Sequence, residues 1–177
     1  MLGPLRHRFT ALERAEEQGI GHYFVPRYTR VIDTVDSRND INKAYSLIST
    51  SKVRNEMIAN DVKQSISQKQ TPVILTRYKE HAKILYDVLK DEADHVFLLY
   101  GDNSDKENAE IRIRLKKVPR TESLILIATG QKIGEGFDFP RLDVLMLAAP
   151  VSFEGRLEQY IGRLNRDYEG KEAVYVY

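Results

Sequence analysis

Three arginines and a glutamine recur at helical spacing near the carboxyl-terminal end of the chain. Arg156, Gln159, Arg163 and Arg166 are three, four and three residues apart, so on one helix they form a single stripe. Guanidinium groups make planar, bidentate contacts with phosphate oxygens and stay charged at neutral pH. The stripe therefore suits a phosphate-rich ligand. A solvated helix face, paired with neighbouring acidic residues, accounts for the same spacing equally well.

A glycine-rich loop comes before this helix. Residues 129–140 read Thr-Gly-Gln-Lys-Ile-Gly-Glu-Gly-Phe-Asp-Phe-Pro and follow an apolar run. Three glycines leave backbone N–H groups open to an anion, because no Cβ atom shields them. An ordinary turn is the alternative, since glycine-rich turns are common.

The elements that would position these groups are short apolar strands that alternate with helices. Runs rich in Val, Ile and Leu predict strands at residues 73–76, 96–100, 124–128, 144–148 and 174–177. We therefore expect an α/β fold with a mostly parallel sheet and helices on both faces. Functional groups of such a sheet gather beyond the carboxyl ends of its strands. We expect the arginine stripe and the glycine-rich loop at that same edge.

Helical periodicity fills the segments between these strands. It predicts a helix at residues 79–90 and another at 153–166, and Ser104 with Glu107 forms a capping-box pattern at the start of a third. Residues 39–68 are helical in pattern, with a break at 49–51. The first 36 residues differ, with a short helix near 11–18 and extended pieces near 23–25 and 31–35.

The two chemistry-bearing segments together resemble a known family. Residues 127–140 resemble motif V of superfamily 2 helicases, and Gln159-Tyr-Ile-Gly-Arg-Leu-Asn-Arg166 resembles motif VI, Q-x-x-G-R-x-x-R. Residues 71–85 are similar to motif IV, a strand that turns into a helix. The resemblance covers residues 38–177, and the order and separation of the motifs also match. It implies the C-terminal RecA-like domain of such a helicase, with a three-layer fold.

The resemblance implies roles on the nucleotide side. Arg163 and Arg166 would be arginine fingers that reach the γ-phosphate of ATP held by a partner domain. Gln159 would line the same cleft, and Gly136 and Asp138 would face the nucleotide, with Asp138 near the ribose. The partner would be the N-terminal RecA-like ATPase domain of the same protein. That domain would hold most of the ATP and Mg²⁺, and we expect no metal site in this chain.

The resemblance also implies a nucleic-acid track. Thr129 and Gly130 would contact the nucleic-acid backbone, and Thr76 and Arg77 would add further backbone contacts. We expect DNA rather than RNA. Tyr160 stands where many members carry an arginine, and the spacing from residue 129 to 138 is one longer than in DEAD-box proteins. These departures point to restriction-enzyme-like or excision-repair-like helicases.

Two features bear on what the chain does alone. Residues 91–94 spell D-E-A-D, but they follow a predicted helix and precede a predicted strand, so we expect a plain loop there and no metal site. The P-loop pattern G-x-x-x-x-G-K-[ST] does not occur in the sequence. The resemblance therefore implies that this chain alone neither hydrolyses ATP nor unwinds a duplex. Its first five residues resemble the stretch after motif III, so we expect a fragment of a longer helicase.

Composition excludes several classes of protein. A net charge of +1 excludes a protein that coats nucleic acid through charge alone, and the absence of cysteine excludes disulfides and thiolate metal sites. No apolar run approaches the roughly 20 residues that span a bilayer, so we expect no membrane partner. No secretory signal is apparent, and we expect a cytoplasmic protein. Residues 37–177 would form the domain, after an interdomain linker or leading strand at 1–36.

Two other functions stay open at this stage. One is a RecA-like module that binds nucleic acid or protein without catalysis. The other is a small-molecule enzyme on a doubly wound fold. For the latter, the four histidines are scattered and form no constellation of acid, base and nucleophile.

Overall fold

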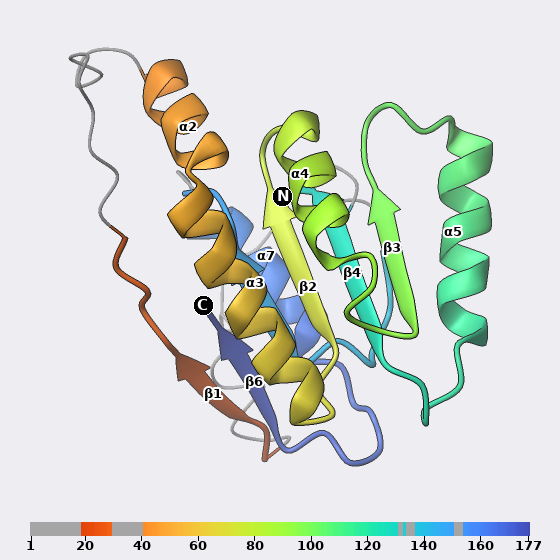
Figure 1. Ribbon diagram of the computed structural model, residues 1–177. Coiled ribbons are helices and arrows are strands. Elements are labelled where there is room, and N and C mark those ends of the chain that lie inside the picture. The colour runs from red at the N-terminus through yellow and green to blue at the C-terminus, as the bar shows by residue number, and fades with distance from the viewer. Residues whose placement is uncertain (1–18, 30–40, 131–132, 134–136, 151–153) are drawn as a thin grey trace, which may run out of the picture.

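One parallel sheet forms the centre of the molecule (Figure 1). The computed structural model describes residues 19–29, 41–130, 133, 137–150 and 154–177 of the chain. Within these ranges, six strands lie in the order β1-β6-β5-β2-β4-β3. Their bounds are β1 Gly21–Phe24, β2 Pro72–Thr76, β3 His95–Leu99, β4 Leu124–Thr129, β5 Val144–Leu147 and β6 Ala173–Val176. The five strands predicted from residue 73 onward are confirmed, and the extended piece near 23–25 is the edge strand β1.

Helices connect the strands and cover both faces of the sheet. They are α2 Ile41–Thr50, α3 Lys52–Ser67, α4 Lys79–Leu89, α5 Asp105–Lys117 and α7 Glu154–Leu164. The predicted break at 49–51 is confirmed, because Ser51 caps α3. The capping box of Ser104 and Glu107 at the start of α5 is also confirmed. The pieces predicted near 11–18 and 31–35 lie outside the described residues. In the described ranges no helix is long and apolar enough to cross a membrane.

Side chains of strands β2 to β6 alternate between two apolar layers. Leu124 and Leu126 of β4 pack with residues of α5 and α7 on one face. Ile125 and Ile127 pack with residues of α3 and α4 on the other. Figure 1 shows α3 and α4 in front of the sheet and α7 behind it. The three-layer α/β fold is therefore confirmed, and its strands carry few polar residues because both faces are buried.

The D-E-A-D letters form a turn between α4 and β3. The carboxylate of Asp94 accepts hydrogen bonds from the N–H and the hydroxyl of Ser123, both at 2.7 Å. These bonds hold the pKa of the Asp94 carboxyl below its usual value. Ser123 comes directly before β4, so the turn lies at the amino ends of the strands and serves as a structural clamp.

Candidate functional site

The end of helix α7 packs against the loop that follows β4. Arg163, in the last turn of α7, donates from its guanidinium group to the carbonyl of Phe137 over 2.5 Å. Arg166 lies beyond the helix, and its Nε atom is 3.8 Å from a carboxylate oxygen of Asp138. The Arg166 and Asp138 side chains are 59% and 61% exposed. The structure thus brings three predicted nucleotide-side residues together and leaves two of them accessible to a ligand.

The prediction of a helix through residue 166 is wrong. Helix α7 ends at Leu164, and the N–H of Asn165 closes it on the carbonyl of Ile161 at 3.0 Å. The carbonyls of Leu164 and Arg166 accept hydrogen bonds from the side chain of Lys171, in place of the amides of a further turn. Arg166 is therefore placed by the turn after α7 and not by helical periodicity.

The other residues predicted for α7 are divided between its two faces. Tyr160, Ile161 and Leu164 are buried, as the apolar stripe predicted. Gln159 is exposed on the helix surface. Gly136 lies outside the described residues, and so does the side chain of Arg156. Among the described residues, no group of three or more His, Cys, Asp or Glu side chains could hold a metal ion.

The loop between β4 and β5 joins opposite edges of the sheet. Near its start, the hydroxyl of Tyr160 donates to the carbonyl of Gly130 over 3.2 Å. At its end, Arg141 donates to the hydroxyl of Thr71 and the carbonyl of Pro119, which precede β2 and β4. The loop therefore leads from the carboxyl edge of the sheet to the amino edge, and it contacts α7 on the way.

The expectation that the arginines lie at the carboxyl edge is therefore wrong. A helix that follows a parallel strand runs back along the sheet, so its last turn lies near the amino ends of the strands. Arg163 and Arg166 lie at that end, beside the far end of the loop. Thr129 lies at the carboxyl end of β4. The predicted site is thus two clusters, joined by one loop.

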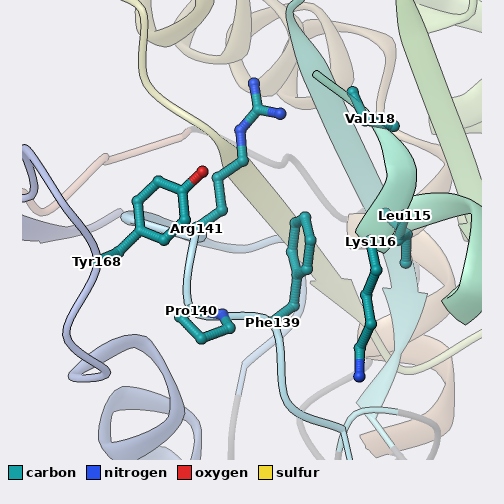
Figure 2. Close-up of a pocket in the computed structure, with 7 residues that line it drawn as sticks. All are labelled: Leu115, Lys116, Val118, Phe139, Pro140, Arg141 and Tyr168. Atoms are coloured by element: carbon teal, nitrogen blue, oxygen red, sulfur yellow. The ribbon is translucent and has the colours of Figure 1, made fainter. Parts of the chain in front are cut away.

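A small pocket lies between the end of α5 and the far end of the loop (Figure 2). Its lining residues are Leu115, Lys116, Val118, Phe139, Pro140, Arg141 and Tyr168. Arg141 donates to the carbonyls of Pro119 and Glu122, so its charge is engaged within the fold. Apart from Lys116 and Tyr168, the remaining lining residues are apolar. Neither Arg163 nor Arg166 lines this pocket.

The contact between Gly130 and Tyr160 gives a first prediction. A Cβ atom at residue 130 would lie 2.5 Å from the Tyr160 hydroxyl oxygen, which is too close for both to keep their places. We expect Gly130→Ala to cost about 1–3 kcal/mol of unfolding free energy. The cost should fall by about 1 kcal/mol or more in a Tyr160→Phe background, because the clashing oxygen is gone.

Urea unfolding of the two single variants and the double variant measures this coupling. Gly101→Ala is the matched control, because a Cβ atom at residue 101 would have no neighbour within 4 Å. Additive effects of Gly130→Ala and Tyr160→Phe would contradict the predicted packing of the loop on α7.

The second cluster lies at the carboxyl ends of β2 and β4. Thr76 and Thr129 are register partners on these neighbouring strands, and Gly130 and Arg77 follow them. Thr76 is 4% exposed and Thr129 is 8% exposed, whereas the Arg77 residue is exposed. The four predicted nucleic-acid residues are thus brought together, and Arg77 is the member whose side chain reaches solvent.

Two tyrosines hold Arg77 at this edge. Its guanidinium carbon lies 4.8 Å from the ring centre of Tyr45 and 5.9 Å from that of Tyr78. The two rings meet edge to face, 6.2 Å apart. The cation–π contacts orient the side chain and leave its N–H donors available. These tyrosines were missed from the sequence, although Tyr78 directly follows the predicted arginine.

Further basic side chains follow the same edge towards β3. Lys79 and Lys83 both form ion pairs with Asp102, at 2.9 and 3.2 Å. Lys83 also lies 5.4 Å from the ring centre of Tyr100. The Asp102 pairing holds the pKa of Lys79 above its usual value. Basic groups interleaved with aromatic rings are typical of surfaces that bind single-stranded nucleic acid.

A buried network fixes the end of β2. The hydroxyl of Thr76 lies 2.8 Å from Nδ1 of His81, and Nε2 of the same ring lies 3.0 Å from the side-chain oxygen of Asn55. The Asn55 amide group then donates to the carbonyl of Ser49. An oxygen acceptor at Nε2 requires the proton there, so Nδ1 accepts from Thr76. Thr76 is therefore an anchor of the edge, and sequence spacing did not reveal this network.

This network should make stability depend on pH. Burial, together with the nearby Arg54 charge, lowers the pKa of His81 to about 4. The unfolded chain binds this proton near pH 6.5 and the folded chain does not, so stability is full above pH 6.5 and falls towards pH 4. We expect protonation of His81 to lower the unfolding free energy by about 3 kcal/mol by pH 4.

Urea unfolding at pH 7 and pH 4.5 tests the His81 prediction. The His81→Gln chain should lose much less stability between these two pH values. His95→Gln is the control, because His95 is partly exposed and pairs with Glu122. If His81→Gln leaves the acid loss unchanged, the assignment of the titration to His81 is wrong.

The curated proteins that are similar in sequence are named transcript termination proteins. No family model matches the chain. Transcript termination protein A18 of Myxoma virus (strain Lausanne) is 24% identical over 168 residues, which cover 89% of this chain and 34% of that protein. The protein of the same name from Fowlpox virus (strain NVSL) is 29% identical over 117 residues, which cover 64% and 24%. The chain thus spans about a third of these relatives or less.

Solved structures identify the fold. T4 UvsW matches 89% of this chain and 31% of its own, with a TM-score of 0.65 and 21% identity. The Sulfolobus solfataricus SWI2/SNF2 ATPase core in complex with dsDNA matches 79% of this chain and 32% of its own, with a TM-score of 0.60 and 12% identity. Domain 2 of the DEAD-box helicase Mss116p, bound to an RNA duplex, matches 73% and 49%, with a TM-score of 0.53 and 21% identity. The chain therefore has the fold of the C-terminal RecA-like domain of superfamily 2 helicases.

Proposed function

We propose that this chain is the second motor domain of an ATP-dependent nucleic-acid helicase or translocase. It would work with an N-terminal RecA-like domain of the same protein, which holds most of the ATP and Mg²⁺. Residues 37–177 would form the motor domain, and residues 1–36 would lead into it. Within residues 1–36, strand β1 pairs with β6 along the edge of the sheet, which supports an attachment of this segment to the motor domain.

One observation carries this proposal: the loop after β4 contacts α7 near both of its ends. Tyr160 contacts Gly130 beside the carboxyl edge, and Arg163 contacts Phe137 at the far end. A movement of the nucleotide-side cluster would therefore be passed to the nucleic-acid edge through one packed unit. This is the connection that a motor needs between ATP turnover and its track.

The nucleotide side of the proposal rests on charge and accessibility. Arg163 and Arg166 would stabilise the charge that spreads over the transferred phosphoryl group. Asp138, exposed beside Arg166, would meet the ribose, and Gln159 would line the cleft from the surface of α7. Gly136 would approach the nucleotide through its backbone. The ion pair between Arg166 and Asp138 is loose at 3.8 Å, so ATP can replace it at little cost.

The track side rests on the carboxyl edge of β2 and β4. Arg77 would contact a backbone phosphate, and the backbone amides near Thr129 and Gly130 would contact the next one. Thr76 would act by anchoring this edge through His81. We propose DNA as the track, because the ATPase core in complex with dsDNA has a higher TM-score than the domain bound to an RNA duplex.

A competition experiment decides the track. Labelled single-stranded DNA is bound to the chain and displaced by unlabelled DNA or RNA of the same sequence. The proposal predicts that DNA displaces the label at a lower concentration. Equal or better displacement by RNA would contradict the DNA assignment, and no binding of either would contradict the track itself.

A further inference from the structure

Lys171 occupies an unusual place at the end of helix α7. Its ammonium group donates to the carbonyl of Leu164 over 2.6 Å, to that of Arg166 over 3.2 Å and to that of Pro140 over 2.5 Å. Leu164 is the last residue of α7, and Pro140 ends the loop that carries Asp138. One side chain therefore ties together the helix end, the turn after it and the loop.

The ammonium group has no donor to spare for a ligand. A lysine side chain offers three N–H groups, and three carbonyls already accept from it. Burial lowers the pKa of Lys171 to about 8, which still leaves the charged form dominant at pH 7. A cation also suits this position, because the carbonyls at a helix end carry partial negative charge. The role of Lys171 is thus one of holding other groups in place.

The local chain brings Lys171 back to the helix end. The N–H of Lys171 donates to the carbonyl of Tyr168 over 2.9 Å, and this closes a tight turn. Gly170 lies in that turn with a φ of +83°, a conformation that other residues rarely adopt. Seven residues after Leu164, the lysine thus replaces the glycine cap that commonly ends a helix.

Asn165, between Leu164 and Arg166, is held by a contact of its own. The side-chain oxygen of Asn165 lies 2.6 Å from Nε2 of His22 on strand β1, and Asn165 is 2% exposed. Three consecutive residues are thus held, Leu164 and Arg166 through their carbonyls and Asn165 through its side chain. The exposed side chain of Arg166 extends from this stretch towards Asp138.

We infer that Lys171 is a positioning residue for the arginine pair: its ammonium group fixes the turn that carries Arg166 against the loop that carries Asp138. This inference rests on the proposed function, because positioning matters only if the arginines meet a phosphate. A misplacement of about 1 Å at a reacting group can cost roughly 100-fold in rate. Lys171 therefore acts on turnover without touching the nucleotide.

Hydrogen exchange in the 177-residue chain tests the clamp directly. In the Lys171→Met chain, the backbone amides of residues 164–167 should exchange about tenfold faster or more, while those of β2 and β4 keep their rates. Lys90→Met is the matched control, because Lys90 also lies at the end of a helix, α4, but it is exposed and contributes its backbone N–H to that end. If the Met variant does not fold, Lys171→Gln removes the same charge and keeps one donor group. Unchanged exchange at residues 164–167 would overturn the inference.

Kinetics then separates positioning from simple stability. In the protein that joins this chain to its ATP-binding domain, Lys171→Met should lower kcat by roughly 10- to 100-fold and leave KM for ATP nearly unchanged. Lys171→Arg, which restores the charge and the donors, should recover most of the loss. Equal losses in the Met and Arg variants would overturn the inference. If Arg163→Ala leaves turnover unchanged, the proposed function fails, and the exchange experiment still decides whether the clamp exists.

Discussion

Replacing Arg163 or Arg166 with alanine should lower kcat for ATP by about 1,000-fold in the protein that joins this chain to its ATP-binding domain. Each guanidinium group would stabilise negative charge that grows on the γ-phosphoryl group during transfer. KM for ATP should change little, because most ground-state contacts belong to the other domain. The measurement is steady-state ATP turnover with saturating nucleic acid.

The double variant tests whether the two arginines act on the same group. Both arginines serve one phosphate group, so Arg163→Ala with Arg166→Ala should lose little more than either single variant. Arg163→Lys keeps the charge but not the planar donors, and it should recover only part of the rate. Arg120→Ala is the matched control, since Arg120 also pairs with an exposed carboxylate, that of Glu169. Turnover within threefold of the parent in both single variants would favour a binding module without catalysis.

The second large effect concerns the track. Arg77→Ala should weaken binding of single-stranded DNA by about 5- to 10-fold at 0.1 M salt, because one phosphate contact and its released counterion are lost. The slope of log affinity against log salt should also fall by about one unit. Fluorescence anisotropy at several salt concentrations measures both quantities on the 177-residue chain.

A matched arginine distinguishes this role from general charge. Arg114 also lies over an aromatic ring, 5.4 Å from the centre of Phe97. It is in the last turn of α5, a helix that runs back from the carboxyl end of β3 towards the amino ends of the strands. Arg114→Ala should leave the salt slope unchanged. Equal losses in the Arg77 and Arg114 variants would show that charge alone, and no edge of the sheet, attracts the nucleic acid.

Local patterns were enough to predict the elements of the fold. The strands are runs of Val, Ile and Leu because both faces of the sheet are buried, and such runs are visible in sequence. The start of α5 was visible in the pair Ser104 and Glu107, since both partners of a capping box lie within one helical turn. The D-E-A-D letters could be dismissed for a similar reason, because their place between a helix and a strand was already evident.

The errors arose where contacts between distant residues decide the structure. Helical spacing placed Arg166 on α7, but the helix ends at Leu164, where the lysine side chain replaces the next turn. That lysine also reaches Pro140, a residue 31 positions away, and no local pattern reports such a contact. The position of the arginines at the amino edge of the sheet was also missed. The rule that places functional groups at the carboxyl ends of strands applies to loops that directly follow a strand. It does not apply to the last turn of a helix that has already run back along the sheet.

The nucleic-acid edge was only partly predictable for the same reason. Thr76 and Arg77 could be named from their place after a strand. The buried partner of Thr76 is His81, and its bond to Asn55 crosses 26 residues of sequence. Two rings orient Arg77. Tyr78 is the next residue in the sequence, whereas Tyr45 lies on α2 and reaches Arg77 only through tertiary packing.

ATP turnover by the ATP-binding domain, measured with and without this chain joined to it, tests the central claim most directly. We predict that the domain alone turns over ATP at a background rate and that the joined chain raises the rate by about 1,000-fold in the presence of nucleic acid. The same fusion with Arg163→Ala and Arg166→Ala should stay at background. Full turnover by the ATP-binding domain alone, or ATP hydrolysis by the 177-residue chain alone, would contradict the account.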